Sequence, residues 1–127
     1  MTETFAYIAT MILVLLTVFQ IALIAGAPIG KFAWGGAHTV LPTKLRIGST
    51  VSIFLYFIFS IIILNKAGLI DLIDNDSFIN VGIWALAGYF LLGVLMNGIS
   101  RSKLERAVMT PVALILAILC FLVAINQ

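Results

Sequence analysis

The sequence predicts an all-α fold: a polytopic membrane protein with a four-transmembrane-helix bundle and an ordered cytosolic loop between helices 1 and 2. Of the 127 residues, 63% are hydrophobic and 9% are charged, whereas an average soluble domain has about 25% charged residues. Four segments are apolar enough to cross a bilayer, and the charge between them alternates in sign. We therefore expect a single transmembrane domain over residues 1–127.

Each apolar segment approaches the length of about 20 residues that a helix needs to cross the hydrocarbon layer. None contains Asp, Glu, Lys, Arg or His. A signal peptide would start with basic residues, but the residues before the first segment have none, so we expect a retained helix. The predicted spans are residues 8–27, 47–64, 78–96 and 107–125.

The charges between these spans predict the orientation of the chain. Segments 28–46 and 97–106 each carry three basic residues, and both tails have none. Segment 65–77 has one basic residue, Lys66, against three aspartates. Because basic loops remain in the cytoplasm, we expect both termini outside, in a multi-pass protein of the bacterial cytoplasmic membrane.

The first basic loop is longer than the 2 to about 8 residues that usually join neighbouring helices. Its large apolar side chains are Phe32, Trp34, Val40 and Leu41. Exposing such groups to water costs about 1.5–3 kcal/mol each. We therefore expect an ordered cap in which Trp34, Gly35, Gly36 and His38 form a turn against the ends of the first and third helices, near Asn97.

The second basic loop leads into a helix start. Residues 102–105 read Ser-Lys-Leu-Glu, which is a capping box. Ser102 would cap the last helix, and the Glu105 side chain would bond back to the Ser102 N–H. Under this interpretation the neighbouring basic residues are headgroup anchors.

A second interpretation is that the two basic loops together bind an anionic group, such as a lipid phosphate or a ligand carboxylate. The planar guanidinium of arginine suits such groups. The expected ligand- or anion-binding residues are Trp34, His38, Lys44, Arg46, Asn97, Arg101 and Arg106.

His38 is the single histidine of the chain and has four interpretations. It is a neutral hydrogen-bonding residue of the cap, part of an anion site with Trp34, a pH-sensitive element, or a metal or haem ligand. Ligation by two histidines of one chain is excluded because there is no second one.

Polar residues within the spans are few. Thr10, Thr17 and Gln20 fall on one side of the first helix at 100° per residue. Such a stripe either faces the bundle and bonds neighbouring backbone or, with Asn80, lines a polar path. Small residues on the third and fourth helices, such as Gly93 and Ala113, allow helices to approach closely.

Catalytic and metal-binding patterns are missing from the sequence. It has no GxGxxG, P-loop, HExxH or CxxC motif, and no span contains a carboxylate or a histidine for a proton relay. The aspartates of 65–77 lack the spacing of an EF-hand, and Cys120 lies in an apolar run. We expect no catalytic residue, no metal and no cofactor, and we regard an enzyme as the less favoured class.

The stretch AGAPIGKFAWGGAHTVLPTKLRIGS, with NGISRSKLERAVMTPV further on, resembles a group of small bacterial integral membrane proteins. Their shared pattern is Ala-Trp-Gly-Gly-x-His, then Leu-Pro-x-x-Leu-Arg, and a Ser-Arg-Ser-x-x-Glu-Arg segment before the last helix. The resemblance covers most of the chain. It implies four transmembrane helices and a bacterial origin, and it implies no activity.

Three functions fit these observations. The first is a non-enzymatic membrane protein whose basic cytosolic face binds an anionic lipid, a small ligand or a partner protein. The second is an oligomeric channel or permease for a small solute, lined by Thr17, Gln20, Asn80 and Asn97. The third is an intramembrane enzyme that uses His38. The expected partners are membrane lipids and a second copy or another membrane protein, and not nucleic acid.

Overall fold

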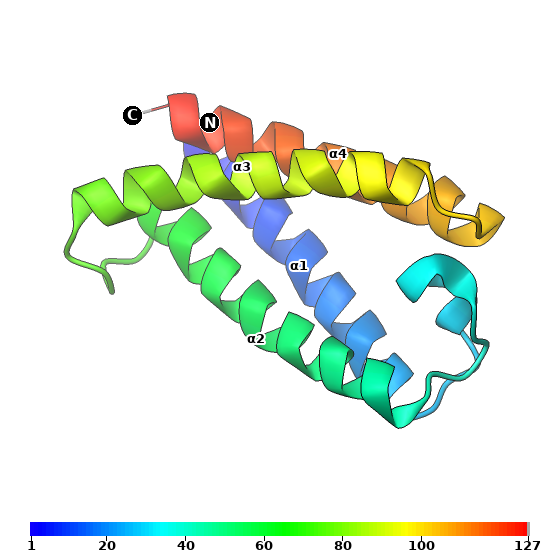
Figure 1. Ribbon diagram of the computed structural model, residues 1–127. Helices are drawn as coiled ribbons and strands as arrows, with labels where there is room; N and C mark the ends of the chain where they lie inside the picture. The colour runs from blue at the N-terminus through cyan, green and yellow to red at the C-terminus, as the bar shows by residue number, and fades with distance from the viewer. Residues whose placement is uncertain (127) are drawn as a thin grey trace.

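The computed structural model describes residues 1–126, and these are all-α with four long helices. Each long helix has the length and apolar composition to cross a membrane, so the predicted four-helix bundle of a multi-pass membrane protein is confirmed. Two short 3-10 helices lie between the first two long ones (Figure 1). The elements are α1 (Thr2–Ile24), η1 (Gly30–Phe32), η2 (Trp34–Gly36), α2 (Thr43–Lys66), α3 (Asp76–Gly98) and α4 (Lys103–Ile125).

The helices begin and end at residues with identifiable local causes. α2 starts directly after Pro42, whose extended backbone leads into the helix. α3 and α4 start at Asn75 and Ser102, whose side chains accept backbone N–H groups as N-caps. α1 ends at Ile24, before the last three residues of the first predicted span, because Gly26 turns the chain with a φ of +95°.

The four helices form two pairs that meet at one end and diverge toward the other. α1 packs along α2, and α3 packs along α4 (Figure 1). Close packing of the second pair uses small residues, since a Cβ added at Gly93 would lie 3.6 Å from the Cβ of Ala113. The two pairs approach each other where both termini and the α2–α3 connection lie. We call this end of the bundle the closed half and the other end the open half.

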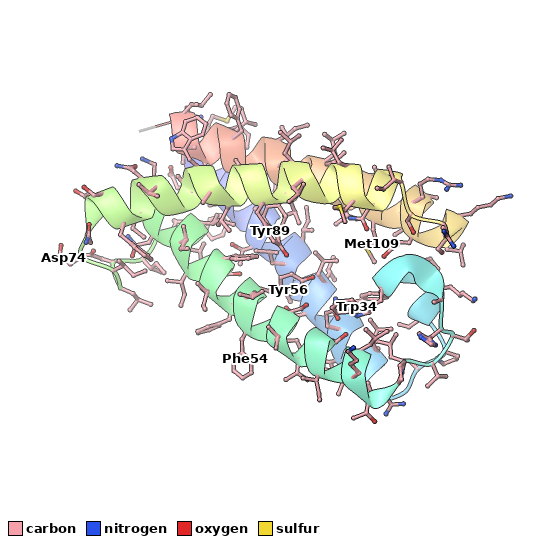
Figure 2. All side chains as sticks on the ribbon, viewed as in Figure 1. Trp34, Phe54, Tyr56, Asp74, Tyr89 and Met109 are labelled. Atoms are coloured by element: carbon pink, nitrogen blue, oxygen red, sulfur yellow. The ribbon has the colours of Figure 1, made fainter. Side chains whose placement is uncertain are left out.

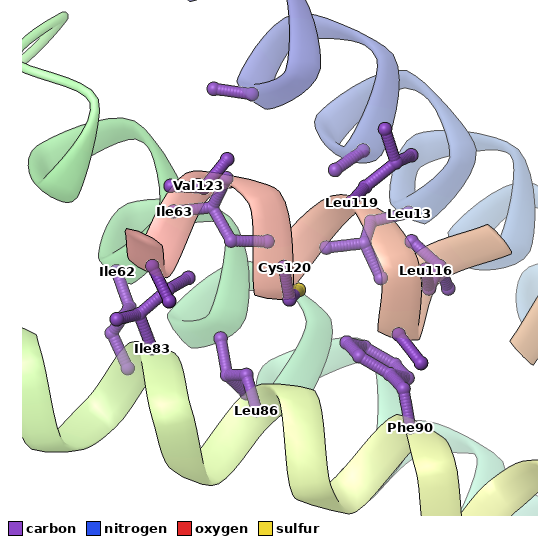
Figure 3. Packing of buried hydrophobic residues seen from close by; sticks show 14 residues of the cluster. Leu13, Ile62, Ile63, Ile83, Leu86, Phe90, Leu116, Leu119, Cys120 and Val123 are labelled. Atoms are coloured by element: carbon purple, nitrogen blue, oxygen red, sulfur yellow. The ribbon is translucent and has the colours of Figure 1, made fainter. Parts of the chain in front are cut away.

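The main hydrophobic core occupies the closed half. Its buried side chains come from the first part of α1 and α3 and the last part of α2 and α4 (Figure 3). Leu13, Ile63, Ile83 and Cys120 are each 0–1% exposed at its centre. A second, smaller cluster of Leu23, Ala33 and Leu41 lies in the open half. Packing in the open half therefore depends on the α1–α2 connection.

The two basic connections share the open end of the bundle. The α1–α2 connection and the α3–α4 turn lie together there, while both termini and the acidic α2–α3 connection lie at the closed end (Figure 1). Six of the seven basic residues are consequently at one end. This charge separation is the arrangement on which the predicted orientation rests.

Candidate functional site

A cavity of about 580 Å³ lies in the open half, between the two helix pairs and the α1–α2 connection. Its walls combine residues of all four long helices with residues 32–35. Tyr56 of α2 and Tyr89 of α3 face each other across the space between these helices, and Trp34 and Met109 lie farther toward the open end (Figure 2). A volume of this size is in the range of small-molecule sites.

The cavity lies where the helix pairs separate, and small residues form part of its wall. Gly93, Ala113 and Ala33 contribute little volume to its walls. Phe90 closes it toward the core, where its ring lies edge-on to that of Phe59 with centroids 5.8 Å apart. The cavity therefore begins where the main core ends.

The α1–α2 connection, residues 25–42, forms the third side of the site, and we call it the capping loop. The Gly30 N–H donates to the Thr39 carbonyl at 2.8 Å and closes the loop on itself. Ser102 donates its hydroxyl to the Lys31 carbonyl, which joins the loop to the start of α4. Gly36 lies against Ser102 so closely that an added Cβ would clash with it.

The capping loop is ordered, but its partners differ from those expected. It packs on the end of α1 through Leu23 and on α4, whereas the sequence suggested the end of α3. The Ser102 hydroxyl donates to the loop, whereas the Asn97 amide at the end of α3 donates to the Gly93 carbonyl of its own helix. Asn97 of α3 and Trp34 nevertheless line the same cavity.

Trp34 connects the capping loop to α2. Its indole Nε1–H donates to the hydroxyl of the fully buried Ser49 at 3.1 Å. Its ring lies against Gly48, where an added Cβ would approach it to 2.8 Å. The backbone of Trp34 has a φ of +52°, in the left-handed region that non-glycine residues rarely adopt. Trp34 is thus held in one position at the cavity wall.

Gln20 is the polar residue at the α1 side of the cavity. Only 7% of its surface is exposed, and its Nε2 lies 3.5 Å from the Tyr56 hydroxyl, which is the long limit of a hydrogen bond. Its Oε1 is buried and has no partner among the described residues. A buried acceptor without a donor costs about 1–3 kcal/mol, so Gln20 has capacity to bind a donor.

Glu105 lines the cavity from the first turn of α4 and is only 8% exposed. Its carboxylate accepts the Ser100 hydroxyl, and not the Ser102 N–H that a capping box would supply. That N–H instead donates to the Ser100 oxygen at 3.1 Å. Ser102 still caps α4, since its hydroxyl accepts the Glu105 N–H at 3.3 Å. The reciprocal half of the predicted box is therefore replaced by a contact to Ser100.

The sequence analysis missed Glu105 as a cavity residue, although its spacing contained a signal. Positions 105, 109, 113, 116 and 120 follow one another at three or four residues along α4, and all of them line the cavity or lie in the core. Glu105 is the first member of this inward stripe. The sequence prediction gave Glu105 only as a cap residue and did not consider the face of α4 on which it lies.

The predicted anion-binding residues separate into three groups, the first of which, Trp34 and Asn97, lines the cavity. Arg46 donates from Nε to the Leu41 carbonyl at 2.8 Å and from Nη1 to the Ile24 carbonyl at 3.3 Å. Arg106 donates to the Ser100 carbonyl at 2.8 Å. These two guanidinium groups satisfy backbone oxygens. His38, Lys44 and Arg101 are exposed and line no part of the cavity.

The residues proposed for a polar path do not form one continuous lining. Thr17 donates to the Leu13 carbonyl one turn earlier at 2.8 Å, while Thr10 has a buried hydroxyl oxygen without a partner among residues 1–126. Asn80 lies near the start of α3 and accepts Lys66 Nζ at 2.6 Å. Of the stripe on α1 only Gln20 reaches the cavity.

The electrostatics of the cavity follow from its lining. Glu105 is the charged residue among the lining side chains, which include no Lys, Arg or His. No group of three or more His, Cys, Asp or Glu residues that could hold a metal ion occurs in the described part of the chain. The chemistry available is hydrogen bonding, apolar contact and one negative charge.

Comparison with protein-family models, with curated proteins and with solved structures gave no match. The functional argument for this chain consequently rests on the geometry of its own residues.

Proposed function

We propose that this protein is a non-enzymatic, membrane-embedded binding protein whose site is the cavity of the open half, and that its ligand is an amphiphilic small molecule. The observation that carries the proposal is the cavity itself, with an apolar body and buried polar groups at separate points. An amphiphile would place its apolar part against the apolar body of the cavity and its polar part against the buried polar groups.

Access to this site is from the bilayer. Three residues of α3 that line the cavity are also exposed on the surface of the bundle: Tyr89 is 50%, Leu92 is 56% and Met96 is 60% exposed. In a membrane this surface faces lipid, so a molecule dissolved in the bilayer reaches the cavity between α2 and α3. Gln20 and Glu105 lie deeper and would contact its polar group.

The test uses dodecanol as a neutral amphiphilic probe and the emission of Trp34 as the readout. In a Trp84→Phe protein in phosphatidylcholine nanodiscs, Trp34 is the remaining tryptophan and lines the cavity. Gly93→Leu adds volume to the cavity wall. Gly88→Leu is its matched control, because an added Cβ at Gly88 meets nothing within 4 Å and Gly88 is outside the lining.

Dodecanol is expected to change Trp34 emission saturably in the parent protein and in Gly88→Leu, and to bind roughly tenfold more weakly to Gly93→Leu. If dodecanol bound Gly93→Leu and Gly88→Leu with equal affinity, the cavity would not be its binding site. Retention of helicity in both variants, measured by circular dichroism, excludes unfolding as the cause.

The orientation belongs to the same proposal. The concentration of basic residues at the open end supports a cytosolic open half, with both termini outside, in the cytoplasmic membrane of a bacterium. A reporter fused after Gln127 should then be active on the outer side. Cytosolic activity of this reporter would reverse the assignment and place the capping loop outside.

A second candidate function concerns the surface of the open end. Lys44 and Arg101 are exposed there, so their charges are available to an anionic lipid headgroup, a ligand or a partner protein. Lys44→Gln with Arg101→Gln should weaken binding of anionic phosphatidylglycerol, measured as the lipid retained in native mass spectrometry. Unchanged retention would restrict binding to the cavity.

A further inference from the structure

Three of the polar side chains that line the cavity present hydrogen-bond acceptors, beside the hydroxyl groups of Tyr56 and Tyr89. Gln20 presents a buried Oε1 without a partner among the described residues. Asn97 uses its Nδ2 to donate to the Gly93 carbonyl at 2.8 Å, which leaves its Oδ1 as the atom that can accept. Glu105 contributes a carboxylate. These three residues come from α1, α3 and α4, and all line one cavity.

The charge of the cavity is uncompensated. Glu105 is only 8% exposed, and its carboxylate accepts a hydrogen bond from one neutral group, the Ser100 hydroxyl. The nearby Arg106 guanidinium is directed to the Ser100 carbonyl. Burying a carboxylate is costly unless a cation or several donors accompany it. The first turn of α4 favours the negative charge through its backbone N–H groups. Its two basic residues, Lys103 and Arg106, are exposed, and among the described residues neither forms an ion pair with Glu105.

The remaining wall suits a cation as well. Trp34, Tyr56, Tyr89 and Phe90 line the cavity, and aromatic faces attract an ammonium group within about 6 Å of the ring centroid. Trp34 is fixed by its bond to Ser49, so its ring needs no reordering when a ligand enters. Acceptor groups, one buried negative charge and aromatic rings together define one kind of ligand.

We propose that the cavity selects a cationic amphiphile with N–H donors, a long-chain or aromatic ammonium, whose head contacts Glu105 and the acceptor oxygens of Gln20 and Asn97. This inference rests on the proposed function, since it names the ligand class of the same cavity. The apolar part of the ligand extends toward the bilayer between α2 and α3. An anionic amphiphile is excluded from the cavity by Glu105.

The experiment compares three probes with the same twelve-carbon chain in phosphatidylcholine nanodiscs. Dodecylammonium has charge and N–H donors, dodecyltrimethylammonium has charge without donors, and dodecanol has neither charge nor an N–H group. Affinity is read from Trp34 emission in the Trp84→Phe protein. Because charge-assisted hydrogen bonds contribute more than neutral ones, dodecylammonium should bind about tenfold or more tightly than dodecanol.

Glu105→Gln tests the charge and keeps an acceptor for the Ser100 hydroxyl. It should reduce the affinity for both cationic probes about tenfold or more. It should reduce the affinity for dodecanol much less, because the glutamine amide still accepts a hydrogen bond from a neutral hydroxyl. Glu3→Gln, which removes an exposed carboxylate at the opposite end of the bundle, is the matched control and should change none of the three. Gln20→Leu should weaken dodecylammonium more than dodecyltrimethylammonium, because only the former donates to Oε1.

The outcomes separate this inference from the proposed function. If Gly93→Leu weakens dodecanol binding while the parent protein binds dodecanol as tightly as dodecylammonium, the cavity binds amphiphiles, but the proposed selectivity for cations is wrong. The same conclusion follows if Glu105→Gln binds dodecylammonium as tightly as the parent. If none of the probes binds, the proposed function itself fails. The comparison of probes in the parent protein is decisive even where a variant does not fold.

Discussion

The two halves of the bundle are made by the same four helices, yet they differ in how those helices meet. In the closed half, branched and aromatic side chains from all four helices pack into one core around Cys120 (Figure 3). In the open half the helix pairs diverge, and the buried cluster is reduced to Leu23, Ala33 and Leu41. The capping loop fills part of the remaining space and the cavity is the rest.

Buried polar residues are also distributed unequally between the closed and the open half. The buried polar residues among the described ones are Gln20, Ser49, Ser100 and Glu105, and all of them lie in the open half. A polar group in a well-packed apolar core would lack partners, whereas the open half offers the backbone of the capping loop and space for a ligand. The difference teaches that incomplete packing and buried polar residues occur together in this molecule.

The largest expected effect is in the core of the closed half. Leu13→Ala should lower the free energy of unfolding by about 2 kcal/mol or more, because its side chain is 1% exposed and leaves an unfilled space. Leu15→Ala on the same helix is 63% exposed, so lipid replaces the lost methyl groups and the change should stay below about 0.5 kcal/mol. Denaturation in sodium dodecyl sulfate measures both.

Leu16 extends this series into the open half. It lines the cavity, so part of its side chain already borders empty space, and Leu16→Ala should cost less than Leu13→Ala. A cost equal to that of Leu13→Ala would mean that the open half is packed as tightly as the closed half. The cavity would then be filled by the chain itself in the membrane.

The second effect concerns the attachment of the capping loop to α4. Gly35 and Gly36 have similar φ values, +78° and +73°, so alanine strains the backbone equally at both, by about 1 kcal/mol or more. Only at Gly36 does the new Cβ also clash with Ser102. Gly36→Ala should therefore destabilise the protein more than Gly35→Ala and increase hydrogen exchange of the loop amides. Equal effects would show that the loop moves away from α4 without cost.

The smallest effect is the bond between the capping loop and α2. Trp34→Phe removes the donor to Ser49 and should cost about 1 kcal/mol. In a Ser49→Ala background the same change should cost clearly less, which a double-mutant cycle measures. His38→Ala in the same loop is the control and should change stability by less than about 0.5 kcal/mol, because His38 is exposed. If Trp34→Phe cost as much in the Ser49→Ala background as in the parent protein, the hydrogen bond between Trp34 and Ser49 would be contradicted.

Much of the fold could be predicted from the sequence because membrane helices are recognised by their length and apolar composition. The four spans and the cap at Ser102 depend on local properties of the chain. The order of the loop between the first two helices was predicted from its large apolar side chains. The directions in which side chains point were harder to predict. The spans are apolar on every side, so periodicity distinguishes the face toward the core from the face toward lipid only weakly.

The candidate site shows this limit residue by residue. Trp34 and Asn97 were predicted as site residues, and both line the cavity. Arg46 was predicted to bind an anion, and its guanidinium donates from the start of α2 to the Ile24 carbonyl at the end of α1, a contact over 22 positions of the sequence. Glu105 was predicted as a cap but lines the cavity, where its carboxylate accepts the Ser100 hydroxyl.

The sequence by itself determined that this is a four-helix membrane protein, that Ser102 caps the last helix, and that the basic residues gather at one end, since hydropathy, capping residues and charge act locally. Only the tertiary structure decided that the helix pairs separate in the open half and that Gln20, Asn97 and Glu105 share one cavity. The physical reason is that helix association in lipid depends on the fit of side chains between helices. That fit joins residues far apart in the chain, and no short stretch of sequence contains it.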